Sequence, residues 1–392
     1  MSRVYLDHNA TTPLRAEARA AMVAAMDLVG NPSSVHAEGR AAKMMVERAR
    51  EQVAALVGCK PTQVVFTGSA TEAAALAVAQ KGRFGGRFAA LPTEHDCFLG
   101  WSEAELLALF DARGALDAQG ALTFCDWFLR DSDGAHSADR GPAALIAVSA
   151  ANSETGVMAP GGKVAANNFI DGSHAATVPF GVVCDITQMA GKVPVSYDGD
   201  KRPAYMILSA HKLGGPKGVG ALVNFTADDP TAMLRGGGQE MGRRSGTENV
   251  IGIAGFGAAA AAAQVDVEAG KWDRVEKLRN ILESALEASS NTTIFVGKDA
   301  PRLPNTSCFA TPGWKGETQV MQMDLAGFAI SAGSACSSGK VKASRVLTAM
   351  GLSDVAGDAV RVSLGLETTE DDILRFADTW AQKLRKHESR AA

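Results

Sequence analysis

The sequence predicts an α/β protein built around a mostly parallel sheet. Short apolar segments alternate with helical ones along the first two-thirds of the chain, and polar residues stand where the apolar segments end. The expected strands are 64–67, 145–150, 181–184, 206–209 and 220–224. Because ligands of such sheets bind beyond the carboxyl ends of the strands, we expect the functional residues to follow these segments.

Helices are expected between the strands. The clearest is 41–57, where Met44, Val53 and Leu56 share one face and charged residues occupy the other, with Gly58 ending the helix. Further helices are expected at 16–26, from about 70 to 79, around the alanine run 258–263, at 271–288 and at about 370–386.

The last third of the chain predicts a smaller α+β unit. Short strands are expected near 293–296, 307–310 and 360–364, beside the helices 271–288 and 370–386. Residues 111–141 are polar and weakly patterned, so their elements are not placed.

Composition excludes several function classes. The 392 residues carry a net charge of −4, so there is no basic excess to neutralise the phosphates of a nucleic acid. We find no apolar run near the roughly 18 residues that span a bilayer, and the first residues lack a signal-peptide pattern, so a cytoplasmic protein is expected. The six cysteines show no C-x-x-C spacing and the seven histidines no metal-binding pair, so no resident metal is expected.

Cys336 stands in a segment of small residues, 331–339, that contains only Ser, Ala, Gly and this one thiol. Such a segment packs little and bends easily, which predicts a mobile, exposed loop. A thiol on a mobile loop suits nucleophilic chemistry at a site it must reach and leave. The alternative is a surface cysteine without a function.

Two charged residues follow predicted strands. Lys212 comes after 206–208 in a loop rich in Gly and Pro, which makes it a candidate Schiff-base nucleophile or, alternatively, a solvated lysine. Asp185 ends the strand 182–184, where a carboxylate can pair with the pyridine nitrogen of pyridoxal phosphate. The alternative for Asp185 is a helix N-cap.

Three further features are weaker signals. The segment 68–72 leaves a strand and opens a helix, so its backbone N–H groups predict a phosphate site or simply a capping turn. His95 is a candidate for ring stacking or proton transfer, against a structural histidine. Arg361 is a candidate for binding a substrate carboxylate, against a surface ion pair.

Taken in order, these motifs resemble the cysteine desulfurases, within the class V, fold-type-I family of pyridoxal-phosphate enzymes. The loop around Cys336 is similar to that of the group that serves iron–sulfur assembly. The resemblance runs through 5–13, 30–36, 66–72, 94–95, 185–188, 209–218, 236–249, 302–305, 331–339 and 361–365.

The resemblance implies a large domain over 13–257 with a mostly parallel seven-stranded sheet, and a small domain formed by 1–12 and 258–392. It also implies a homodimer, pyridoxal 5′-phosphate as cofactor and L-cysteine as substrate. A sulfur-acceptor or iron–sulfur scaffold protein is implied as a partner, with no role for nucleic acid or a membrane.

The resemblance further assigns roles at matching positions. Lys212 binds the cofactor covalently, Asp185 holds its pyridine nitrogen, Gln188 its phenolic oxygen, and His95 stacks on the ring and moves protons. Cys336 takes the substrate's sulfur as a persulfide, leaving alanine, and can transiently contact an iron–sulfur cluster. Ala70, Thr71, Ser209 and His211 cradle the phosphate with Thr247 of a second subunit; Asn152 and Ser153 contact the cofactor; Arg361, Asn9 and Asn152 bind the substrate.

Two departures weaken these roles locally. Relatives carry Asn where this chain has Ser153, and Asn residues where it has 73–75 as Ala. Two other functions stay open: a class V aminotransferase or lyase for another amino acid, in which Cys336→Ala would keep full turnover, and a non-catalytic sulfur-assembly scaffold, which would show no visible absorbance with pyridoxal phosphate.

Overall fold

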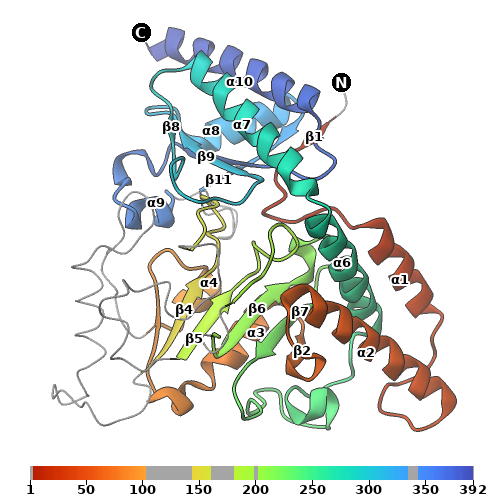
Figure 1. The fold of residues 1–392 in the computed structure, drawn as a ribbon. Helices are drawn as coiled ribbons and strands as arrows, with labels where there is room; N and C mark the ends of the chain where they lie inside the picture. The colour runs from red at the N-terminus through yellow and green to blue at the C-terminus, as the bar shows by residue number, and fades with distance from the viewer. Residues whose placement is uncertain (1–2, 103–143, 160–180, 198–201, 334–342, 392) are drawn as a thin grey trace, which may run out of the picture.

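The computed structural model describes residues 3–102, 144–159, 181–197, 202–333 and 343–391, and these form two units that each contain a sheet (Figure 1). The larger unit holds the predicted α/β sheet, and the smaller unit sits across the end of that sheet. The predicted α/β class is confirmed by this arrangement.

The large sheet has the strand order β2-β7-β6-β5-β4-β3. The neighbours β3 to β6 run parallel, whereas β7 is antiparallel to both β6 and β2. The described residues supply six strands of the seven-stranded sheet that the family resemblance implied. Their bounds are β2 Val64–Thr67, β3 Phe88–Ala90, β4 Leu145–Ser149, β5 Gly181–Asp185, β6 Tyr205–Ser209 and β7 Gly220–Asn224.

Helices cover both faces of this sheet, which explains why its central strands are apolar along their whole length. On one face, the side chains of β2, β5 and β6 pack against α2 and α6; on the other they pack against α3. The helices of this unit are α1 Ala16–Met26, α2 Ala37–Val57, α3 Ala70–Val78, α4 Asp96–Leu99 and α6 Val250–Glu268.

Helix α6 corrects one expectation. Among the described residues, this helix is long and apolar enough to cross a membrane by length and composition alone. The expectation that no apolar run approaches 18 residues is therefore wrong for α6, much of whose apolar content is alanine. However, 56% of its most apolar window is buried inside the protein. Its small residues let it pack closely: a Cβ on Gly257 would lie 2.5 Å from the Ala49 backbone of α2. We therefore interpret α6 as a core helix.

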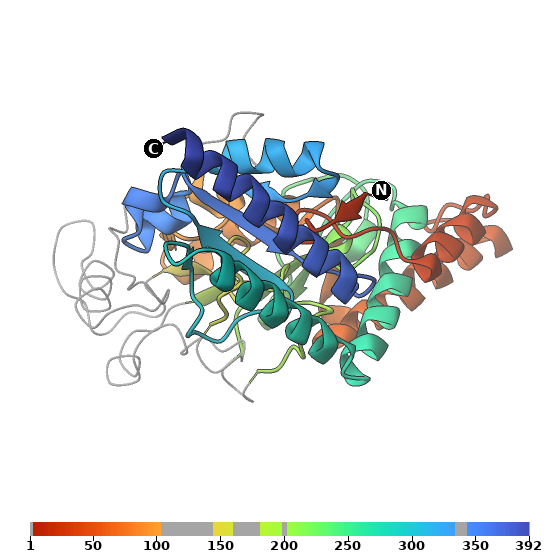
Figure 2. The same ribbon diagram turned by 90° about the horizontal axis from the view of Figure 1, so that it is seen from above.

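The small unit packs α7, α8 and α10 around a four-stranded sheet, β11-β12-β9-β8 (Figure 2). The N-terminal β1 joins this unit, because it pairs with β10 and places Val4 and Leu6 in the small core. The bounds are β1 Val4–Tyr5, α7 Lys271–Ser289, β8 Ile294–Phe295, β9 Thr306–Ala310, α8 Gly316–Leu325, β10 Phe328–Ala329, β11 Ser331–Ala332, α9 Arg345–Ala349, β12 Ala359–Ser363 and α10 Glu370–Ala391.

The elements expected from the sequence are confirmed within four residues at most ends. The short strands β1, β3, β10 and β11 and the helices α4, α8 and α9 were not predicted. The expected domain boundary after residue 257 falls inside α6, and core residues of the large unit continue to Ala263. We propose that the boundary lies after this helix, near Gly270. Short 3-10 helices complete the connections: η1 Pro61–Gln63, η2 Lys81–Phe84, η4 Ala210–Lys212, η5 Gln239–Gly242 and η6 Ser353–Val355.

Candidate active site

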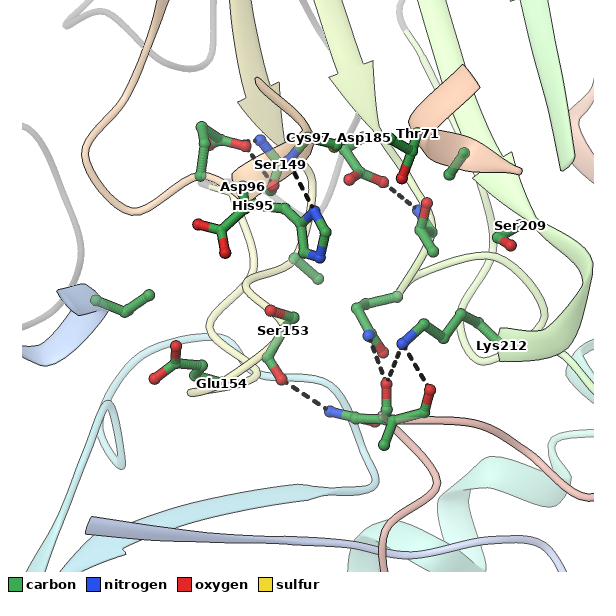
Figure 3. Close-up of a pocket in the computed structure, with 18 of the residues that line it drawn as sticks. Thr71, His95, Asp96, Cys97, Ser149, Ser153, Glu154, Asp185, Ser209 and Lys212 are labelled. Atoms are coloured by element: carbon green, nitrogen blue, oxygen red, sulfur yellow. Dashed lines mark hydrogen bonds between the residues drawn. The ribbon is translucent and has the colours of Figure 1, made fainter. Parts of the chain in front are cut away.

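A cavity of about 410 Å³ lies where β4, β5 and β6 end and the small unit begins. Ser149, Asp185 and Ser209, the last residues of these strands, all line it. Figure 3 shows Asp185 and Ser209 at strand ends and Thr71 at the start of α3, with His95 and Ser153 on one side and Lys212 on the other. The small unit contributes Gly333, Arg345, Val346 and Arg361.

Lys212 reaches the cavity from η4, directly after β6. Its Nζ donates hydrogen bonds to the backbone oxygens of Asn9, at 2.6 Å, and Ala10, at 2.9 Å. These carbonyls belong to the segment that follows β1, so the N-terminal residues hold the lysine from the side opposite the sheet. The predicted position of Lys212 beyond a strand end is confirmed.

Asp185 stabilises a turn rather than a helix. Its Oδ1 accepts a hydrogen bond from the Thr187 backbone N–H at 2.8 Å, and the described residues after it form turns, so it is not the helix N-cap considered as one alternative. The residue also lines the cavity. Beside it, the buried Thr187 hydroxyl has no hydrogen-bond partner among the described residues. Since buried hydroxyls are normally paired, Thr187 offers a contact to a molecule in the cavity.

The N-terminus of α3 forms another wall of the cavity. The Ser69 hydroxyl caps the helix by accepting from the Glu72 N–H at 3.1 Å, while Ala70 and Thr71 open the helix and line the cavity. Their N–H groups belong to the first turn, which has no intrahelical acceptors. The loop rests on β7 at Gly220, where a Cβ would lie 2.5 Å from the Ser69 carbonyl carbon. This end suits an anion such as a phosphate.

His211 lines the cavity close to Lys212. Burial and the positive charges of Lys212 and Lys217 lower its pKa to about 4. Its ring is therefore neutral near pH 7, and it acts as a hydrogen-bonding group there rather than as a cation.

His95 caps the short helix α4. Its Nδ1 accepts a hydrogen bond from the Cys97 backbone N–H at 3.1 Å. Because a backbone N–H only donates, a neutral His95 ring carries its proton on Nε2. The ring thus has a defined tautomer in the cavity (Figure 3), which fits a role in stacking or proton transfer.

Glu94 is a buried acid behind His95 that the sequence analysis gave no role. It is 2% exposed, and its carboxyl group accepts from the Ser149 N–H at 2.9 Å and from the Ser149 hydroxyl. Burial, reinforced by the nearby Asp185 charge, raises the pKa of Glu94 to about 8 despite these hydrogen bonds. Glu94 is therefore mostly protonated at neutral pH in the folded protein.

We expect Glu94→Gln to flatten part of the pH dependence of stability. Between the model-peptide value of 4.5 and about 8, the folded wild type holds a proton that the unfolded chain releases, so its free energy of unfolding falls as pH rises through this window. Gln cannot titrate. Urea unfolding of the cofactor-free proteins at pH 5 and pH 8 should show a smaller decline for the variant, and an equal decline in both would contradict the raised pKa.

Arg361 reaches the cavity from the central strand β12 of the small unit. Its guanidinium donates to the Ser153 carbonyl at 2.9 Å and forms an ion pair with Asp7 at 2.7 Å. Its Nε is buried without a partner among the described residues. The guanidinium is thus fixed in direction and keeps a donor for a carboxylate.

Three predicted site residues are not gathered in this cavity. The Asn152 amide is used by neighbouring backbone: Oδ1 accepts from the Glu154 and Thr155 N–H groups of its own turn, and Nδ2 donates to the Thr93 carbonyl of another loop. The described geometry therefore gives no support to its expected cofactor and substrate contacts. Thr247 lines a separate hollow with Arg244, Glu248 and others. Cys336 lies outside the described residues.

Both described ends of the Cys336 segment lie at the cavity. Gly333 lines it on the N-terminal side. On the C-terminal side, Ser344 donates to a Glu154 carboxylate oxygen at 2.5 Å, and Arg345 contacts Asp96 and the Glu94 carbonyl at 2.8 and 2.9 Å. The large unit therefore holds the point at which this segment returns.

Several cavity residues were missed from the sequence: Glu94, Cys97, Ser149, Thr187 and Arg345. Ser149 ends β4 and Thr187 follows β5, so applying the strand-end rule to every residue there would have found them. Cys97 is a buried thiol in the cavity, and burial with the nearby Asp185 and Glu94 charges raises its pKa well above the usual range. A thiol in that state is a poor nucleophile.

The residues present fit pyridoxal phosphate. The cavity offers an amine from Lys212, a carboxylate from Asp185 and an anion site at the N-terminus of α3, which match the aldehyde, pyridine nitrogen and phosphate of this cofactor. The unpartnered Thr187 hydroxyl adds a donor close to Asp185.

Comparisons with known proteins point the same way. The aminotransferase class-V family model matches residues 4–376. The chain is 36% identical over 380 residues to a cysteine desulfurase of Klebsiella pneumoniae, covering 95% of this chain and 90% of that protein. It is 39% identical over 402 residues to a cysteine desulfurase of Frankia sp., covering 97% and 90%.

Solved structures agree. A NifS-like protein from Rickettsia africae superposes with a TM-score of 0.81 at 27% identity, covering 98% of this chain and 99% of that one. SspA, solved in complex with cysteine, gives a TM-score of 0.69 at 25% identity, covering 93% and 100%. The chain therefore belongs to the class-V aminotransferase family and, within it, to the cysteine desulfurases.

Proposed function

We propose that this protein is a pyridoxal-phosphate-dependent cysteine desulfurase, which converts L-cysteine to L-alanine and receives the sulfur on Cys336 as a persulfide. One observation carries the proposal most directly. Lys212 of the large unit and Arg361 of the small unit open on the same cavity, beside Gly333, from which the chain continues to Cys336.

The proposed roles of the residues follow from their positions. When bound, pyridoxal phosphate withdraws electrons from the amino acid attached to it, so that a carbon–sulfur bond can break. Lys212 holds the cofactor, Asp185 keeps its pyridine nitrogen protonated, and the N–H groups of Ala70 and Thr71 bind its phosphate. His95 stacks on the ring and moves protons through Nε2.

Arg361 is placed to bind the carboxylate of L-cysteine. The Ser153 carbonyl and Asp7 fix its guanidinium, and its buried Nε offers a donor. A charged, directed donor in a cavity contributes strongly to binding a carboxylate. Asn9, whose amide nitrogen lies 3.4 Å from the Ser153 carbonyl, is close enough to assist.

We expect Arg361→Gln to lower kcat/KM for L-cysteine about 100-fold, mainly through KM, because a charge-assisted hydrogen bond to the substrate is lost. Steady-state alanine formation measures this. Asp7→Asn serves as the matched control: it removes the ion pair but keeps the guanidinium, so its KM should rise much less. Equal KM values for Arg361→Gln and wild type would exclude this carboxylate contact.

Chain geometry supports Cys336 as the sulfur acceptor. Cys336 follows Gly333 by only three residues in the sequence, and Gly333 lines the cavity. In the proposed step, the Cys336 thiolate forms a sulfur–sulfur bond with the substrate sulfur as the substrate's carbon–sulfur bond breaks. The electron pair of the broken bond stays on the carbon, which then takes a proton to give alanine.

We also propose a homodimer in the cytoplasm that passes its sulfur to an acceptor or iron–sulfur scaffold protein. Thr247 lies outside the cavity of its own subunit, as a residue that contacts the phosphate of a second subunit would. Large apolar side chains are exposed along α1, α2 and the segment between them, which suits a subunit interface: Val23, Met26, Val29, Val35 and Met44.

The proposal is tested by incubating the purified protein and pyridoxal phosphate with L-cysteine and a thiol reductant. Alanine and sulfide should appear in equal amounts. Formation of a keto acid without sulfide would instead favour an aminotransferase, and absence of a visible cofactor band would favour a non-catalytic scaffold.

A further inference from the structure

Lys192 is a buried lysine that the proposed chemistry leaves without a role. It follows β5, is 3% exposed and does not line the candidate active-site cavity, although it lines a second hollow of about 400 Å³ on the other side of Lys212 together with His8 and Thr12. Its Nζ donates to the Gln188 carbonyl at 3.0 Å and to the Gln188 Oε1 at 3.1 Å, and it lies 3.5 Å from the Asn9 Oδ1. None of these partners is a carboxylate, so an ammonium group is held here at considerable desolvation cost.

The charges around Lys192 add to this cost. Burial and the positive charges of Lys212 and Arg361 lower the pKa of Lys192 to about 7, and Lys192 in turn helps to keep the His8 ring neutral. Replacement by an apolar residue would remove the cost, which indicates that the nitrogen serves a purpose.

The hydrogen-bonding character of Lys192 fixes its two amide neighbours. The charged form of Lys192, which prevails below about pH 7, only donates, so in this form Gln188 and Asn9 must face it with their amide oxygens. Their amide nitrogens consequently point elsewhere. Gln188 Nε2 donates to the Asn9 carbonyl at 3.0 Å, which is the same oxygen that accepts from Lys212 Nζ.

Asn9 is held in the same sense. Its Nδ2 donates to the Thr306 hydroxyl at 2.9 Å and lies 3.4 Å from the Ser153 carbonyl, where Arg361 also donates. Asn305 provides Asn9 Oδ1 with a second donor at 3.1 Å. The Gln188 Oε1 depends on Lys192 more strongly than Asn9 does.

We propose that Lys192 is a positioning residue: it orients the Gln188 amide, and secondarily that of Asn9, so that Gln188 Nε2 lies at the Asn9 carbonyl beside Lys212 Nζ and Asn9 Nδ2 lies near the Ser153 carbonyl beside Arg361. This inference rests on the proposed function, because it assigns Gln188 Nε2 as a donor to the phenolic oxygen of pyridoxal phosphate. Lys192 itself touches neither cofactor nor substrate.

The test uses Lys192→Met in the holoenzyme, with Lys315→Met as matched control. Met keeps the length of the side chain but donates nothing, whereas Lys315 pairs with Asp358 in the small unit, away from the cavity. The pH at which the visible band of the bound cofactor changes should rise by about one unit in Lys192→Met, because a cation and an amide donor both favour the deprotonated form. The affinity of the cofactor-free protein for pyridoxal phosphate should fall about tenfold.

A second variant covers a failure of Lys192→Met to fold. Lys192→Gln stays polar, but its amide both donates and accepts, so it satisfies the buried partners without dictating their orientation. Its band should shift in the same direction. The double variant Lys192→Met with Gln188→Ala is compared with Gln188→Ala alone. Its pH midpoint should be higher only by the part that the Lys192 charge contributes, because the amide to be oriented is already absent.

The outcomes separate the two proposals. A wild-type protein that forms no visible band with pyridoxal phosphate would overturn the proposed function, and this inference with it. A normal wild-type band whose pH midpoint and affinity are unchanged in the folded Lys192 variants would overturn only the role of Lys192, and a loss of thermal stability alone would assign it a purely structural role.

Discussion

Lys212→Ala should lose the visible band of bound pyridoxal phosphate and at least about a thousandfold of the alanine-forming activity. The physical reason is that the variant keeps the anion site at α3 but has no amine to join the cofactor or to return protons during turnover. Absorbance spectra of the protein after addition and removal of excess cofactor measure the first effect, and alanine release from L-cysteine measures the second.

Lys217→Ala is the matched control for Lys212→Ala. Lys217 belongs to the same Gly-rich loop but is exposed and does not line the cavity. Its variant should keep both the band and the activity. A Lys212→Ala protein that retains a stable visible band would show that another amine binds the cofactor, and the account of this cavity would be wrong.

Cys336→Ala should abolish sulfide release from L-cysteine while leaving the visible band of the cofactor intact. The thiol is the group that takes the sulfur, whereas Lys212, Asp185 and the phosphate site do not depend on it. Sulfide and alanine are measured in the same reaction, and we expect the rate of sulfide release to fall about a thousandfold or more.

Cys97→Ala provides a demanding control, because Cys97 is the thiol that the described part of the cavity contains. Its raised pKa keeps it protonated and inert, so this variant should retain sulfide release. Loss of activity in Cys97→Ala together with full activity in Cys336→Ala would identify Cys97 of α4, and not Cys336, as the nucleophile.

Much of the fold could be predicted from the sequence, because its strongest signals are local. The strands β4 to β7 are buried on both faces and are therefore continuously apolar. Helix α2 is buried on one face and therefore shows apolar residues at helical spacing. The two-residue strands β1 and β10 could not be found this way, since they exist through their pairing across more than 300 residues. The apolar character of α6 was underestimated because alanine is only weakly hydrophobic, although it allows two helices to pack closely.

The candidate site was predictable where it follows the strand-end rule. Lys212 and Asp185 were found because they end or follow strands of one sheet, whereas Ser209 came only from the family resemblance. Glu94 and Lys192 were not, because their importance comes from burial next to particular neighbours, and burial is a tertiary property. Conversely, the sequence predicted a ligand role for Asn152, whereas its amide bonds the backbone of its own turn and of Thr93.

The most direct test of the central claim is the mass of the protein after a single turnover. The holoenzyme is mixed with one equivalent of L-cysteine without reductant, quenched by alkylation and digested. We predict one added sulfur atom on the peptide that carries Cys336, with one alanine released per sulfur bound. Alanine release with the added sulfur on Cys97, or with no protein-bound sulfur at all, would contradict it.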